Sequence, residues 1–94
     1  MKIQIKDKEF NLEYNNKALF RIEKETGISV IELFQDEKEL SKMHTAFTIV
    51  WAGIKENITF DEFSDLANIN DLLDIIPQIT VVIGESFETG AKKK

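Results

Sequence analysis

Residues 18–33, ALFRIEKETGISVIEL, decide the fold because they predict a helix, an abrupt stop and a capped restart. Gly27 stands where the first helix would end in the left-handed conformation, which glycine adopts at little steric cost. Ser29 and Glu32 then have the spacing of a capping box, which opens a second, short helix. The apolar residues of this second helix are Ile31, Leu33 and Phe34.

The residues before this stretch predict a β-hairpin that leads into the first helix. Apolar and polar residues alternate over 2–14 with the period of a strand, interrupted at Asp7-Lys8, the expected turn. A two-stranded hairpin is marginal alone and must lay its apolar face on helices. Asn15 and Asn16 offer the N-cap of the first helix. The apolar residues of this region are Ile3, Ile5, Phe10, Leu12 and Tyr14 in the hairpin and Ala18, Leu19 and Ile22 in the helix.

The strongest helical period in the chain runs from Leu40 to Ile54. Apolar residues step by three and four, and others widen the stripe until the helix is apolar nearly all round. We expect such a helix at the centre of the domain or covered by another chain, with Asn57 closing it. The stripe consists of Leu40, Met43, Phe47, Val50 and Ile54, widened by Ala46, Ile49, Trp51 and Ala52.

Two helical segments are predicted after the central helix. Thr59 and Glu62 form a capping box that opens the first of them. Asn70 is the expected cap of the second. Pro77 should kink or divide that helix, because it has no N–H and its ring crowds the preceding turn. The apolar residues are Phe63, Leu66 and Ala67 in the first segment and Leu72, Leu73, Ile76, Ile79, Val82, Ile83 and Phe87 in the second.

Length and composition limit the class of protein. The 94 residues, 43% hydrophobic and 31% charged, predict a single domain over 1–90, ended by Gly90, and a flexible basic tail at 91–94. The expected fold is α+β, mostly α, with an N-terminal β-hairpin packed on a small bundle of about four to five helices. The chain has no Cys, as in a reducing compartment, and it starts as a strand rather than a signal peptide. No apolar run approaches the roughly 18 residues of a membrane span, so we expect a cytosolic protein.

The charges are unevenly distributed along the chain. Residues 1–55 contain nine basic and nine acidic residues, whereas 56–91 contain eight acidic residues and no basic one. Lys92, Lys93 and Lys94 then bring the net charge to −5. An acidic half repels nucleic-acid phosphates and favours a basic partner. The alternative is a solvated acidic surface that keeps the protein soluble.

The residue types that carry chemistry are scarce. His44 is the only imidazole and has no partner at metal-ligand spacing, so we expect no metal site. Pairs of carboxylates such as Asp61 with Asp65, or Asp71 with Asp74, are explained by helix starts and solubility. No nucleophile motif, glycine-rich loop or cofactor site is present. The sequence therefore does not predict an enzyme.

The break at Gly27 also has the form of a helix-turn-helix, whose second helix would be Val30 to Leu40. A recognition helix enters the major groove beside phosphates, and its exposed side is usually basic or amidic. Here that side is dominated by carboxylates, which argues against DNA binding. The residues of that side are Glu32, Asp36, Glu37 and Glu39 against Gln35 and Lys38.

The order of these segments resembles the tail assembly chaperones of long-tailed, siphovirus-type bacteriophages. The resemblance rests on a β-hairpin, ALFRIEKETGISVIELF, an aromatic helix ending WAGIK, and TFDEFSDL. It runs from Ile3 to about Phe87 and departs at Asp7-Lys8, where a glycine-containing turn is expected. Its most specific residues are Ala18, Leu19, Glu23, Thr26, Gly27 and Leu33, with Trp51, Ala52, Gly53, Thr59, Phe63 and Leu66.

The resemblance implies a chaperone that binds the tape measure protein, helps recruit tail tube subunits and is absent from the mature virion. It also implies a longer product of programmed frameshifting, for which the lysine codons of 92–94 supply an A-rich message. A small helical interaction or regulatory protein, in its sharpest form a helix-turn-helix DNA-binding protein, is the alternative.

A chaperone of this kind needs an apolar groove, because tape measure proteins are long helices with apolar stripes. Self-association is another way to cover such a surface. Trp51 is the strongest interface candidate, because aromatic residues are enriched in binding hot spots. The candidate partner-binding residues are Phe47, Trp51, Phe60, Phe63, Val82 and Phe87, with Asp65, Asp71 and Asp74 as a rim that steers a basic partner.

Overall fold

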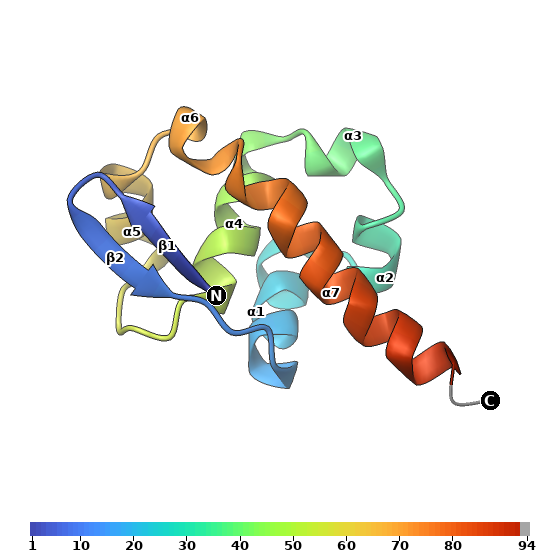
Figure 1. Ribbon diagram of the computed structural model, residues 1–94. Coiled ribbons are helices and arrows are strands. Elements are labelled where there is room, and N and C mark those ends of the chain that lie inside the picture. The colour runs from blue at the N-terminus through green and yellow to red at the C-terminus, as the bar shows by residue number, and fades with distance from the viewer. Residues whose placement is uncertain (93–94) are drawn as a thin grey trace.

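The computed structural model describes the backbone of residues 1–92 and the side chains of residues 1–84. Over this part of the chain an antiparallel hairpin precedes seven helices, three of which have a single turn (Figure 1). The predicted class, α+β and mostly α, is confirmed. The elements are β1 (Lys2–Ile5), β2 (Lys8–Asn11), α1 (Asn16–Thr26), α2 (Val30–Leu33), α3 (Glu37–Leu40), α4 (Met43–Gly53), α5 (Phe60–Leu66), α6 (Ile69–Leu72) and α7 (Ile75–Lys92).

The hairpin turns one residue earlier than predicted. Ile5 pairs with Lys8, so the turn is Lys6-Asp7 rather than Asp7-Lys8. Lys6 has a φ of 58°, in the left-handed region that favours glycine, and its backbone is therefore strained. The buried apolar residues of the hairpin segment are Ile3, Ile5, Phe10 and Leu12, as their alternation predicts.

The predicted helix ends around Gly27 are confirmed. Asn15 caps α1, and its side-chain oxygen accepts from the Ala18 N–H at 3.0 Å. Gly27 ends α1 at a φ of 73°, the left-handed conformation expected there. The Ser29 hydroxyl accepts from the Glu32 N–H at 3.2 Å and donates to the Glu32 carboxylate at 3.1 Å. Local sequence therefore sets both sides of this break.

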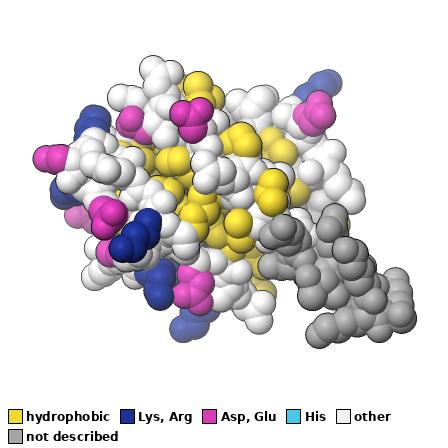
Figure 2. Space-filling view, in the orientation of Figure 1, with side chains coloured by type: hydrophobic (Ala, Val, Ile, Leu, Met, Phe, Trp, Pro, Cys, Tyr) yellow, Lys and Arg dark blue, Asp and Glu magenta, His cyan; other side chains and the backbone are white. Residues whose placement is uncertain are grey.

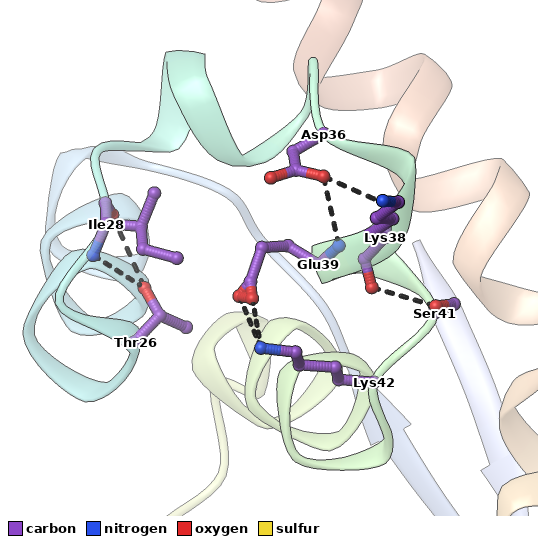
Figure 3. Close-up of polar contacts among 7 residues, drawn as sticks. All are labelled: Thr26, Ile28, Asp36, Lys38, Glu39, Ser41 and Lys42. Carbon is purple, nitrogen blue, oxygen red and sulfur yellow. Dashed lines mark hydrogen bonds and ion pairs between the residues drawn. The ribbon is translucent and has the colours of Figure 1, made fainter.

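The helix that follows Gly27 is shorter than the 30–40 segment considered for DNA binding. It stops after the single turn of α2, and Asp36 then caps α3 by accepting from two backbone N–H groups, at 3.1 and 3.3 Å (Figure 3). Lys42 forms an ion pair with Glu39 at 2.6 Å just beyond α3. Ile31, predicted on the apolar side of α2, is 60% exposed.

Helix α4 occupies the centre of the molecule, as its nearly all-round apolar pattern predicts. Helices α1, α3, α5, α6 and α7 all pack on it, and six consecutive residues of α4 are buried. The helix starts only at Met43, which is 57% exposed, and ends at Gly53 rather than at Asn57. Ile54 leaves the helix because it bridges to Leu12 after the hairpin. This bridge ties the hairpin to the end of the central helix.

Gly53 allows Tyr14 to pack against the last turn of α4. A Cβ atom at position 53 would overlap the Tyr14 ring. The Tyr14 hydroxyl donates to the Ile49 carbonyl at 2.7 Å, and burial raises the pKa of the Tyr14 phenol far above its usual value. The close approach therefore joins the segment before α1 to the central helix.

The predicted cap of α5 is confirmed, and the predicted cap of α6 is wrong. Thr59 and Glu62 form a complete capping box, in which the Thr59 hydroxyl accepts at 3.1 Å and the Glu62 carboxylate accepts at 2.9 Å. The hydrogen bonds from Thr59 hold the pKa of Glu62 below its usual value. Helix α6 begins after Asn68 rather than Asn70, and the Asn68 N–H donates to the Asp71 carboxylate at 3.0 Å.

Pro77 lies in the first turn of a new helix rather than at a kink. Helix α6 ends at Leu72 and α7 starts at Ile75, so the last segment is divided before the proline. No backbone N–H is needed in a first helical turn, which is why proline is accepted there. Helix α7 continues past Gly90, the predicted end of order, to Lys92, and its second half projects away from the rest of the molecule (Figure 1).

Candidate functional site

Two of the expected partner-binding residues lie in the core. Phe63 is completely buried and Phe47 is 8% exposed. Their rings meet edge to face with centroids 6.0 Å apart, and Phe10 from the hairpin reaches Phe63 at 6.5 Å. The structure therefore assigns these rings to the packing of α4, α5 and the hairpin instead of a surface groove.

Trp51 and Phe60 are half-buried and border a surface hollow between α1 and the loop that joins α4 to α5. Their rings meet edge to face with centroids 5.7 Å apart, and the Trp51 indole N–H donates to the Ile58 carbonyl at 2.8 Å. The Arg21 guanidinium stands 5.7 Å from the Trp51 ring, and His44 contacts Phe60 at 5.4 Å. We call the site formed by Arg21, Trp51 and Phe60 the aromatic hollow.

The aromatic hollow is open and mixed in charge. Its volume is about 510 Å³, and its charged lining residues are Arg21 and Lys55 against Glu25 and Glu56. A smaller hollow of about 200 Å³ beside it shares Arg21 and Lys55. Glu56 accepts from the Asn11 backbone and side chain, and these hydrogen bonds hold its pKa below the usual value. The hollow can receive a side chain of a partner, but its balanced charges select no particular sign.

Helix α7 exposes an apolar surface on the side opposite to its core contacts. Its inward residues are buried, whereas Val81 is 58% exposed and Pro77, one turn earlier, is exposed too. Leu73, in the turn before α7, is also 58% exposed. No charged residue occurs in 75–84, IIPQITVVIG. We call the surface of Leu73, Pro77 and Val81 the outer face of α7, and Figure 2 shows hydrophobic side chains gathered over this region.

The remaining expected binding residues are divided among α5, the region of this outer face and the part outside the described side chains. Asp74 is exposed next to it, and Asp71 is half-buried, where it caps α6. Asp65 is exposed on α5. Val82 is 39% exposed on α7. The Phe87 side chain lies outside the residues that the structure describes.

Sequence reasoning missed that Leu73, Pro77 and Val81 face outward. Leu73 was predicted in the buried stripe, but that stripe is instead Leu72, Ile75, Ile79 and Ile83. The signal was present, since the apolar residues 73, 77 and 81 are spaced by one turn and Asp74 is the one charged residue among 73–81. A second apolar row on a helix that already has a buried row indicates a surface for a partner.

The 30–40 segment lacks the geometry of a DNA-recognition helix. The break between α2 and α3 leaves two single turns where such a helix needs a continuous face. Over the residues with described side chains, no group of three or more His, Cys, Asp or Glu could hold a metal ion.

No helix in the described part of the chain is both long and apolar enough to cross a membrane. Comparison of the chain with protein-family models, with curated proteins and with solved structures finds no match.

Proposed function

We propose that this chain is a tail assembly chaperone of a long-tailed bacteriophage and acts in the cytoplasm of the bacterial host. In this role it binds apolar helical segments of the tape measure protein, helps recruit tail tube subunits and leaves before the virion is mature. The observation that carries the proposal is the outer face of α7, an exposed apolar surface with no charge over 75–84. The resemblance of residues 3–87 to these chaperones supports the identity of the partners.

The outer face of α7 offers a moderate binding energy. Burying a whole leucine or valine side chain contributes about 1.5 to 3 kcal/mol. Leu73 and Val81 are each 58% exposed, so a partner gains about 1 to 2 kcal/mol from each, or roughly tenfold in affinity per side chain. This strength suits a chaperone, which must shield an apolar stripe and later release it.

Co-expression with the longest reading frame that follows this gene tests the proposal. We expect the second protein to stay soluble and to elute together with this chain, and to aggregate when this chain is omitted. Aggregation despite a folded chain, with no co-elution, would contradict the chaperone function. In that case a DNA-binding assay at low salt tests the helix-turn-helix alternative.

Two matched variants test whether binding depends on the outer face of α7 or on any exposed apolar side chain. Val81→Asp places a charge on the outer face of α7, whereas Phe20→Asp alters an apolar side chain on α1 that is 65% exposed. Both positions are exposed, so both variants should fold, which circular dichroism checks. We expect Val81→Asp to lose the complex and Phe20→Asp to retain it.

The coding region offers a test that needs no protein. A major tail protein gene before this gene and a very long gene after it support the proposal. The longer product requires a slippery heptamer near the lysine codons of 92–94 and an overlapping reading frame. If the nucleotides contain neither, the frameshift part of the proposal fails and the binding role is unaffected.

A further inference from the structure

We infer that the outer face of α7 selects a partner helix whose apolar stripe is flanked by lysine or arginine. The inference rests on the proposed function in taking this face as the client-binding surface, and it adds the charge of the client. Shape alone would accept any amphipathic helix, whereas charge distinguishes between them.

The charged residues of the segment that carries this face all have one sign, since 68–84 contains Asp71 and Asp74 and no Lys or Arg. From Met43 to Gly84 the chain contains one basic residue, Lys55, and six acidic residues. Helix α4, a major packing partner of α7, has no Lys, Arg, Asp or Glu, and α6 contributes only Asp71. Lys55 lies at the aromatic hollow, where it pairs with Glu13 at 3.2 Å. On its own segment the apolar face is therefore accompanied by carboxylates and by no base, and Asp74 is the exposed one.

Asp74 is the acidic residue best placed to form an ion pair with a bound partner helix. It is exposed, and it forms no ion pair with any residue whose side chain is described. It precedes Val81 by seven residues, which is about 10 Å along a helix. A partner helix whose apolar residue covers Val81 can therefore bring a basic residue, two turns away, to the Asp74 carboxylate. A glutamate at that place would be repelled.

Two synthetic helical peptides with the same leucine stripe test the inference. One carries lysines beside the stripe and the other carries glutamates, and fluorescence anisotropy reports their binding to the full chain. We expect the lysine peptide to bind at least about threefold more tightly at low salt, as for one or two exposed ion pairs. In about 1 M salt, where the Debye length is about 3 Å, the preference should disappear.

Charge reversals locate the preference on the molecule. Asp74→Lys should abolish the preference for the lysine peptide, whereas Asp7→Lys, the same change in the exposed hairpin turn, should preserve it. Val81→Asp should weaken both peptides, and circular dichroism confirms that each variant is folded. Equal affinity for both peptides, or equal effects of the two charge reversals, would overturn the inference.

Two further outcomes separate this inference from its alternatives. If the chain alone forms a dimer that Val81→Asp dissociates, the face is covered by a second copy and the inference is overturned. If the co-expression experiment fails while the lysine peptide is selected through Asp74, the charge preference stands and the tape measure protein is excluded as its client. If co-expression keeps the second protein soluble while the two peptides bind equally well, the chaperone function is retained and the charge preference is rejected.

Discussion

Replacing Gly53 by alanine tests the packing that joins the N-terminal segment to the central helix. Alanine is favoured over glycine by about 1 kcal/mol within a helix, so helix propensity alone predicts stabilisation. The structure predicts the opposite, because the new Cβ atom overlaps the Tyr14 ring. Displacing that ring loses its hydrogen bond to Ile49, worth about 1 kcal/mol, and overpacking costs a further 1 to 3 kcal/mol or so. We expect Gly53→Ala to lower the free energy of unfolding by about 1 to 3 kcal/mol.

Gly84→Ala is the matched control for this prediction. Gly84 also lies within a helix, but a Cβ atom there meets nothing within 4 Å. We expect this variant to gain about 0.5 to 1 kcal/mol. Urea unfolding followed by circular dichroism measures both variants, and 1 kcal/mol corresponds to a midpoint shift of about 0.5 to 1 M.

A double-mutant cycle decides whether Tyr14 is the cause. In a Tyr14→Ala background the ring is absent, so Gly53→Ala should become neutral or stabilising. If Gly53→Ala costs the same in both backgrounds, or stabilises the wild-type chain as Gly84→Ala does, the close packing of Tyr14 on α4 is refuted.

Three other predictions concern local features of the chain. Lys6→Gly should raise the free energy of unfolding by up to about 1 kcal/mol, because it relieves the left-handed backbone at φ 58°, and an unchanged urea midpoint would contradict this. Asn15→Ala removes the cap of α1 and should cost about 1 kcal/mol, whereas Asn16→Ala, one residue inside the helix, should cost less. Glu62→Gln tests the lowered pKa of Glu62, whose ionised carboxylate stabilises the fold above its unfolded pKa and loses this effect as the pH falls through its folded pKa. The difference in the free energy of unfolding between wild type and Glu62→Gln should therefore shrink between pH 7 and pH 3. A constant difference in urea unfolding would refute this.

Much of the fold could be predicted because its signals are local. The caps at Asn15, Ser29 and Thr59 and the stop at Gly27 involve residues at most four positions apart, so the sequence shows both partners together. The wrong end of the central helix involves a distant partner. Asn57 does not end the central helix, because Ile54 forms a β-bridge with Leu12, which follows the hairpin and lies more than 40 residues earlier in the chain.

The candidate site was predicted less well, because periodicity shows which residues are apolar and not which of them are covered. Phe47 and Phe63 have the aromatic residue type of a binding hot spot, but both are buried, where they pack on each other and Phe63 also contacts Phe10 of the hairpin. Leu73 belongs to an apolar run, but α6 and α7 meet so that Leu72 turns inward and Leu73 outward. Only Trp51 and Phe60, among the expected aromatic residues with described side chains, remain at the surface.

The sequence by itself determined the class of fold, the helix caps at Asn15, Ser29 and Thr59, the central place of α4 and the acidic character of the second half. These properties depend on residue type, on spacing within a turn or two, and on summed charge. Only the tertiary structure decided which apolar residues remain for a partner. Exposure depends on which elements meet, and Val81 remains at the surface because α7 packs on α4 with its opposite side, where Ile75, Ile79 and Ile83 are buried.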